Sequence, residues 1–231
     1  MQWETETMQV AYRLYYLIGR DSDLFHREKD ATDRALAGNS LAAAGPEHLT
    51  VITGTHTGAI RLTVEKRSDE PGPPPAQWET AADVSLYSTS GRLWLSEWAG
   101  KLVDSAGNLA HTGSGWYRVR VQARGRDRGA AHGTVQSWVE EHLLSIWPAR
   151  PDPDKVHRVT DTFGLHYYDP QRPNDSPVYP ADALPWAIKR DNAGIRAWAE
   201  QLGYDAPGQD RIVAAIHAAS LGKPSTGAPP E

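Results

Sequence analysis

The 231-residue sequence contains no cysteine, and this absence removes several classes of chemistry at once. Disulfide bonds, thiolate metal sites and cysteine nucleophiles are all excluded. The sequence also has no run approaching the roughly 18 apolar residues that a transmembrane helix needs. Its first residues, Met1 to Glu6, lack the basic start and apolar stretch of a signal peptide. We therefore expect a cytoplasmic protein with no membrane partner.

Motifs of enzyme chemistry and of metal binding are also missing. The nine histidines are scattered, with no His-x-His, His-x-x-x-His or His-Glu-x-x-His spacing. The glycine loop at 54–58 lacks the lysine of a phosphate-binding loop, and the segment 113–116 lacks the second glycine of a nucleophile elbow. No acid, base and nucleophile can be assigned together. The sequence predicts no catalytic residues, no cofactor, no metal site and hence no enzyme.

Phenylalanine and methionine are scarce, with two of each, but nine Trp and nine Tyr supply large apolar surfaces. Aromatic and β-branched residues gather in short runs that Gly-rich or Pro-rich turns separate. These runs are 8–18, 49–53, 59–65, 81–87, 92–98, 116–123 and 138–147. A short helix at 36–44 is also expected. Short strands without a strand–helix rhythm indicate an antiparallel β-sandwich in residues 1–150.

Alternation along two of these runs predicts which side chains face the core. In 116–123, Tyr117, Val119 and Val121 fall on one face, and Arg118 and Arg120 fall on the other. We therefore expect the two arginines to be exposed. By the same rule Trp94 and Trp98 share a face and are expected in the core.

An arginine-rich stripe continues from this strand into the next loop and consists of Arg118, Arg120, Arg124, Arg126 and Arg128. Arginines in this arrangement suit an anion, a phosphate backbone or an acidic protein partner. The alternative is a solvated strand face whose arginines pair across the sheet with carboxylates such as Glu140 and Glu141.

The periodicity changes after a Pro-rich and Asp-rich segment, 151–184, which we expect to be an irregular connector. Ile195, Trp198, Ala199 and Leu202 then recur at helical spacing, and a second helix is expected from about Gln209 to 221. The sequence thus predicts an α+β protein. A small helix-turn-helix-like module occupies 185–223, and a flexible tail occupies 224–231.

The C-terminal segment resembles the DNA-binding domain of the actinobacterial histone-like nucleoid-structuring (xenogeneic silencer) proteins. The shared residues are Ile195-Arg196, Trp198-Ala199, Gly203-Tyr204 and Arg211-Ile212. The resemblance implies that Arg196, Gln209 and Arg211 contact double-stranded DNA. The family's Arg-Gly-Arg loop is Gln209-Asp210-Arg211 here, and the module carries a net charge near +1. An aspartate in this place opposes minor-groove insertion, so only weak binding to DNA is expected.

The N-terminal region is similar, more faintly, to the β-sandwich of the competence protein J family, whose members are nuclease inhibitors. The similarity lies in the order of an early aromatic strand, a tryptophan-bearing strand pair, a Gly-Trp-Tyr-Arg-Val-Arg strand at 115–120 and a closing Trp147-Pro148. It implies an all-β architecture and binding to a partner.

Two functional hypotheses follow. The first is a non-enzymatic, cytoplasmic binding or regulatory protein that associates with DNA through the C-terminal module. The second is a protein-binding inhibitor or immunity-type factor that acts through the β-sandwich, with the helical module as an oligomerisation or adaptor piece. The oligomeric state stays open.

Overall fold

The computed structural model describes residues 2–19, 32, 35–36, 38–45, 48–88, 90–168, 170, 192–201, 205–210 and 212–213. The chain divides into two compact units, Met1–Pro177 and Val178–Glu231. Within the described residues, no helix is both long and apolar enough to cross a membrane.

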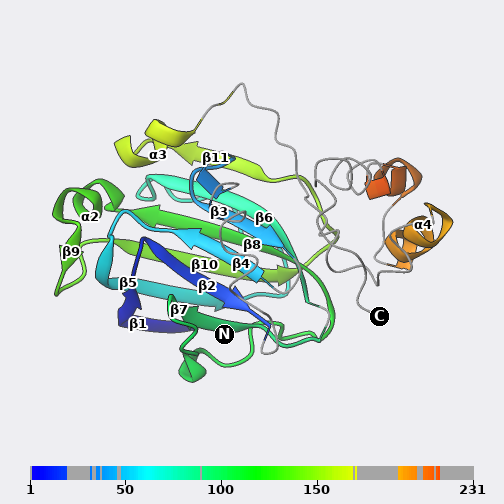
Figure 1. Cartoon of the computed structure of the whole chain (residues 1–231), viewed down its shortest axis with the longest axis horizontal. Helices are drawn as coiled ribbons and strands as arrows, with labels where there is room; N and C mark the ends of the chain where they lie inside the picture. The colour runs from blue at the N-terminus through cyan, green and yellow to red at the C-terminus, as the bar shows by residue number, and fades with distance from the viewer. Residues whose placement is uncertain are drawn as a thin grey trace, which may run out of the picture. The chain divides into compact units, whose positions relative to one another are not determined.

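The first unit is built mainly from strands (Figure 1). In chain order the strands are β1 (Gln2–Val10), β2 (Leu14–Ile18), β3 (Ala42–Gly45), β4 (His48–Ile52), β5 (Thr57–Lys66), β6 (Thr80–Ser88), β7 (Trp94–Glu97), β8 (Gly115–Arg124), β9 (Thr134–Val135), β10 (Glu141–Pro148) and β11 (Lys155–Val159). Short helices accompany them: the 3₁₀ helix η1 (Asp104–Ala106), α2 (Arg126–His132) and α3 (Thr162–Tyr167). In the second unit lies α4 (Asn192–Gln201).

The strands form two sheets. The larger sheet has the order β1-β5-β10-β8-β6-β11, with β9 beside β5, and the smaller one has the order β3-β4-β2-β7. Side chains from both sheets contribute to one hydrophobic core, including Tyr15 and Leu49 from the smaller sheet and Ile60, Val119 and Ile146 from the larger. The predicted β-rich architecture with two sheets is confirmed. The pairing is not wholly antiparallel, because β5 runs parallel to both β10 and β9.

Three segments differ from their predicted secondary structure. The run 8–18 is not one strand, because a turn at 11–13 divides it between β1 and β2. Of the predicted helix at 36–44, residue 36 is helical, but residues 38–41 form a turn and 42–44 belong to β3, which pairs with β4 along Ala42–Gly45. The connector 151–184 is not irregular over 155–167, where β11 and α3 form, since β11 pairs with β6 and Asp161 caps α3 by accepting a hydrogen bond from Gly164.

In the second unit, Ile195 and Ala199 of α4 are buried, and so is Ile212 of the following helical segment. The second helix begins earlier than predicted, since residues 206–210 are already helical. Asp205 explains the early start, because its carboxylate accepts a hydrogen bond of 2.9 Å from the Gly208 backbone N–H, as an N-cap does. The side chain of Trp198, Leu202 and the chain beyond 213 lie outside the described residues.

Candidate functional site

The turn between β1 and β2 has an unusual backbone conformation. Tyr12 and Arg13 both have positive φ, 54° and 67°, although neither is a glycine. Surrounding contacts hold the turn: the Arg13 N–H donates to the His56 carbonyl at 3.0 Å, and the Thr53 N–H donates to the Arg13 carbonyl at 2.8 Å. The Arg13 guanidinium also donates to the Gly54 carbonyl. Strain of this kind persists only where neighbours determine the conformation, and it is concentrated at functional sites.

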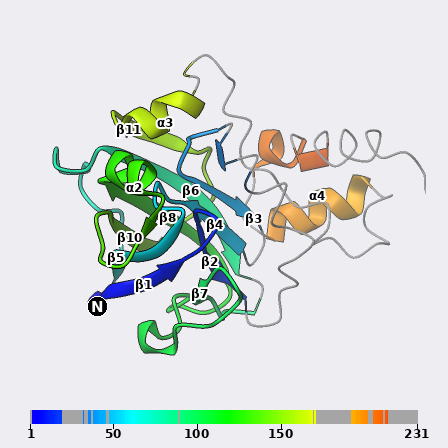
Figure 2. The same cartoon turned by 60° about the vertical axis from the view of Figure 1, so that its left-hand side comes forward.

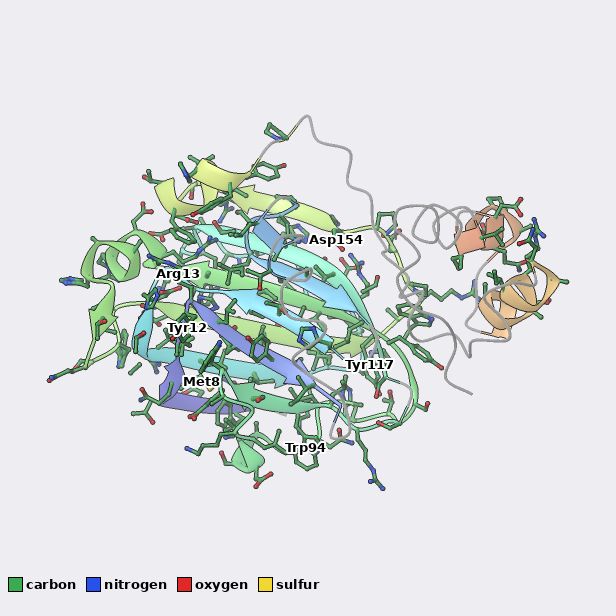
Figure 3. The ribbon with its side chains drawn as sticks, in the orientation of Figure 1. Met8, Tyr12, Arg13, Trp94, Tyr117 and Asp154 are labelled. Carbon is green, nitrogen blue, oxygen red and sulfur yellow. The ribbon has the colours of Figure 1, made fainter. Side chains whose placement is uncertain are left out.

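The turn presents an aromatic side chain to solvent. Tyr12 is 61% exposed, and its ring centroid lies 4.6 Å from that of Trp98 and 5.5 Å from that of His56. Trp98 is itself 36% exposed, and His56 is exposed. We call these three residues the aromatic surface; Figure 3 labels Tyr12 and Arg13 at the turn. Exposed Tyr and Trp held in a fixed geometry are the side chains that dominate binding energy at protein interfaces.

A buried network of hydrogen bonds supports the loop that carries His56. The Glu140 carboxylate accepts from the Gly54 N–H at 2.9 Å and from the Thr55 N–H at 2.7 Å. It also lies 2.8 Å from His142 Nε2, and His142 Nδ1 lies 3.0 Å from the Tyr15 hydroxyl. This buried network thus connects β2, β10 and the 53–56 loop.

The protonation states in this buried network follow from the surroundings of its side chains. Burial alone would raise the pKa of Glu140, but hydrogen bonding and the charge of His142, with the N–H groups of Thr55 and Gly54, outweigh burial and lower it. Burial, and then the nearby Glu140 charge, raise the pKa of Tyr15 well above its ordinary value. An ionised Glu140 can only accept, so His142 Nε2 is the donor. Because all three side chains are fully buried, the buried network supports the loop, and none of its groups is accessible to a substrate.

A buried arginine supports the same end of the first unit. Arg126 is fully buried in α2 and donates to the Ser40 carbonyl at 2.7 Å. Its Nη1 lies 3.7 Å from Asp161, and its guanidinium lies 4.8 Å from the centre of the Phe163 ring. The Arg13 guanidinium lies over the same ring at 5.1 Å. Phe163 of α3 therefore links the strained turn to α2 through two cation–π contacts.

The prediction that Arg118 and Arg120 are exposed is wrong. Both are buried, although the opposite face of β8 does carry Tyr117, Val119 and Val121 into the core as predicted. The reason is that segments outside the sheet cover this second face. Arg120 Nη1 donates to the Pro71 carbonyl at 3.1 Å, and Arg118 Nη1 donates to the Asp152 carbonyl at 2.5 Å.

Arg120 is also neutralised where it lies. Its Nε and Nη2 donate to the two carboxylate oxygens of Asp83 at 2.6 and 2.9 Å, and His157 Nε2 lies 3.0 Å from the same carboxylate. Burial alone would raise the pKa of Asp83, but the hydrogen bonds from Arg120 and His157 outweigh it and hold the pKa below its ordinary value. This group stabilises the sheet and presents no anion-binding surface.

The other predicted arginines do not make one surface either. Arg124 is half-buried and forms a two-pronged pair with Glu141, at 3.0 and 2.8 Å, which is the cross-strand pairing that the alternative interpretation anticipated. Arg126 is buried, and Arg128 is exposed. The five arginines therefore separate into buried, paired and exposed side chains.

The predicted DNA-binding residues have an unexpected partner. Arg196 of α4 is exposed, but its Nε and Nη2 donate to a carboxylate oxygen of Asp210 at 3.0 and 2.9 Å. Gln209 is half-buried, and Arg211 lies outside the described residues. The aspartate that replaces the family's glycine thus pairs with the arginine that the resemblance assigns to DNA.

Sequence reasoning did not find the aromatic surface. Trp98, expected in the core, follows the end of β7 and is exposed, while Leu93 and Leu95 are the residues that enter the core. Tyr12 lay inside the presumed single strand, where nothing marked a turn. Among the described residues, no group of three or more His, Asp or Glu side chains could hold a metal ion.

Comparison with known proteins gives weak structural similarity. No family model matches the chain, and no curated protein matches it. One similar structure, titled "Crocagin biosynthetic gene J", has a TM-score of 0.43 and 16% identity, and the match covers 65% of this chain and 98% of the other. A second, ComJ from Bacillus subtilis, titled as an inhibitor of the DNA degrading activity of NucA, has a TM-score of 0.45 and 12% identity, covering 64% and 98%.

These matches bear differently on the two predicted resemblances. The second agrees, as a weak structural similarity, with the expected likeness of the N-terminal region to the competence protein J family. At such scores the likeness carries no information about activity or partner. The resemblance of the C-terminal segment to the nucleoid-structuring proteins has no support from a family model.

Proposed function

We propose that the chain is a non-enzymatic regulatory protein that binds a protein partner through the aromatic surface of its first unit. The observation that carries this proposal is the exposure of Tyr12 on a strained turn, in contact with Trp98 and His56. We interpret the two sheets of this unit as a β-sandwich that serves as a rigid support. An inhibitor or immunity-type factor is the kind of protein this arrangement suits.

The chemistry of interfaces supports the proposal. Tyr and Trp bury a large area with few rotatable bonds, so they lose little entropy when a partner binds. Here the turn is already fixed by Arg13 and by the loop that Glu140 holds, so the surface is arranged before binding. The buried titratable groups of the site are in contact with one another, which suits a supporting role.

The aromatic surface can be tested by capture from a native lysate, with and without nuclease treatment. We expect the wild-type chain to retain a protein after nuclease treatment and Tyr12→Ala to lose it. Leu165→Ala is the matched control, because Leu165 is 53% exposed but belongs to α3. Retention of the same protein by Tyr12→Ala would contradict the proposal.

DNA association through the second unit is the other candidate function, and the Arg196–Asp210 pair predicts that it is weak. We expect the full chain to bind AT-rich duplex with a dissociation constant of roughly 10⁻⁴ to 10⁻⁶ M, as for non-specific contacts. Gln209→Arg with Asp210→Gly should strengthen binding and steepen its salt dependence, because the change frees Arg196 and adds a cation. Fluorescence anisotropy measures both. Submicromolar, AT-selective binding by the unmodified chain would contradict this expectation.

A further inference from the structure

A cavity of about 500 Å³ lies between β1 and the segment that follows β7. Its apolar lining includes Trp3 and Met8 on one side and Leu102 on the other, and its charged lining includes Glu97, Lys101 and Asp104. Polar atoms make up the larger part of this lining, and the apolar side chains provide a smaller hydrophobic surface beside them. Pockets that combine apolar contacts with well-placed polar groups can fix the orientation of a ligand.

The cavity lies where the margins of the two sheets meet. β1 is the terminal strand of the larger sheet and β7 is a terminal strand of the smaller one, and both views place them along the same margin (Figures 1 and 2). The outer edge of β7 pairs back with its own chain at Leu102. In the part of the chain that the structure describes, no strand pairs with the outer edge of β1. A strand edge of nine residues therefore runs beside the cavity.

The aromatic surface continues this margin. Tyr12 follows the end of β1 by two residues, and Trp98 follows the end of β7 directly. The two rings are 4.6 Å apart, so they join the ends of the two strands. We call the outer edge of β1, the cavity and this ring pair the β1–β7 groove.

The charge of the groove is negative. Glu97 and Asp104 line the cavity. One cation of the lining, Lys101, balances part of this charge, because it lies 3.5 Å from Glu97. Asp104 is exposed in η1, and no ion pair links it to another described residue. Two carboxylates against one cation leave an excess of negative charge in the cavity lining.

We infer that the β1–β7 groove binds an extended, basic segment of the protein partner, which adds as a strand beside β1. This inference rests on the proposed function and specifies the chemistry of the partner. In an added strand, alternate side chains face opposite ways. Apolar side chains of the segment then enter the cavity against Trp3, Met8 and Leu102, and Lys or Arg side chains meet the carboxylates. The strained turn places Tyr12 at the end of the β1–β7 groove.

The test uses a library of random peptides of about nine residues, the length of β1, displayed and selected on the full chain. We expect the selected peptides to be rich in Lys and Arg that alternate with apolar residues. Asp104→Lys should weaken their binding by roughly tenfold, and the loss should grow at low salt, where charges act over longer distances. Asp152→Lys is the control, because this exposed aspartate lies beside Ser85 of β6, several strands from β1.

Each outcome decides the inference. Failure to select peptides, selection without an excess of basic residues, or equal binding by Asp104→Lys and Asp152→Lys overturns it. The proposed function has a separate readout, because it requires only that Tyr12→Ala loses the captured partner. If Tyr12→Ala loses the partner and Asp104→Lys keeps it at full affinity, the aromatic surface binds but the groove does not.

Discussion

Replacing Glu140 by glutamine is expected to lower the free energy of unfolding by about 3–5 kcal/mol, the usual cost of breaking a buried charged interaction. The carboxylate accepts hydrogen bonds from the backbone of Gly54 and Thr55 and from His142. An amide has one acceptor oxygen, so its NH₂ group must face one of these donors. Urea-induced unfolding measures the change.

Glu141→Gln is the matched control for this substitution. Glu141 is the next residue, and its carboxylate pairs with the half-exposed Arg124, so the expected loss is below about 1 kcal/mol. Equal losses of unfolding free energy from the two substitutions would show that the buried network does not hold the 53–56 loop.

The same carboxylate predicts a pH dependence. Because the pKa of Glu140 is lower in the folded state than its ordinary value of 4.5, the stabilisation is complete above that pH and is lost as the pH falls toward the folded pKa. The wild-type chain should therefore lose stability more steeply below about pH 4.5 than Glu140→Gln. Parallel acid limbs in the two stability profiles would contradict this explanation.

Replacing Arg120 by methionine is expected to cost a similar amount, about 3–5 kcal/mol. Arg120 is 1% exposed, and the change leaves the Asp83 carboxylate buried with only His157 beside it. Arg61→Met is the control, because Arg61 is about one-third exposed and its partners are at 3.8 and 4.0 Å. Its removal should cost no more than about 1 kcal/mol. Urea-induced unfolding compares the two variants.

A second substitution tests the physical reason for this loss. Most of the loss comes from the carboxylate that remains, so Arg120→Met with Asp83→Leu should recover much of the stability. If the double variant is as unstable as Arg120→Met alone, packing of the arginine stem accounts for the loss instead.

The sequence predicts one face of β8 and misleads about the other. Period-2 alternation correctly assigned Tyr117, Val119 and Val121 to the core. It also suggested that Arg118 and Arg120 were exposed, because arginine is rarely buried without a partner. The partner of Arg120 is Asp83, which is 37 residues away in the chain, and the carbonyls that accept from Arg120 and Arg118 come from loops. A strand pattern carries no information about contacts of that kind.

The aromatic surface was missed for a related reason. Turns are found through Gly, Asn or Pro, and Tyr12-Arg13 contains none of these. The turn that carries the chain from β1 of the larger sheet to β2 of the smaller one therefore had no local signal. Its conformation depends on Thr53, Gly54 and His56, which approach only after folding. Trp98 was assigned by extending the alternation of β7 past the end of the strand.

The second unit was predictable where the pattern was helical. Ile195 and Ala199 are buried as the 3.6-residue period indicated, while the start of the next helix was placed too late. The Asp-Ala-Pro-Gly sequence at 205–208 suggested a loop, yet an aspartate N-cap followed by a proline is compatible with a first helical turn. The helical period could not predict the ion pair between Arg196 and Asp210, because the two residues belong to different helical segments.

The most direct test of the proposed function is the dissociation constant of the captured partner for the wild-type chain and for Tyr12→Ala, measured by titration calorimetry. Because Tyr12 is exposed and central to the aromatic surface, its truncation should weaken binding by about 2 kcal/mol, or roughly 30-fold, without lowering stability. Leu165→Ala should bind within about twofold of the wild type, as expected for an exposed side chain outside the interface. An unchanged affinity of Tyr12→Ala, or an equal loss in Leu165→Ala, would show that the partner binds elsewhere.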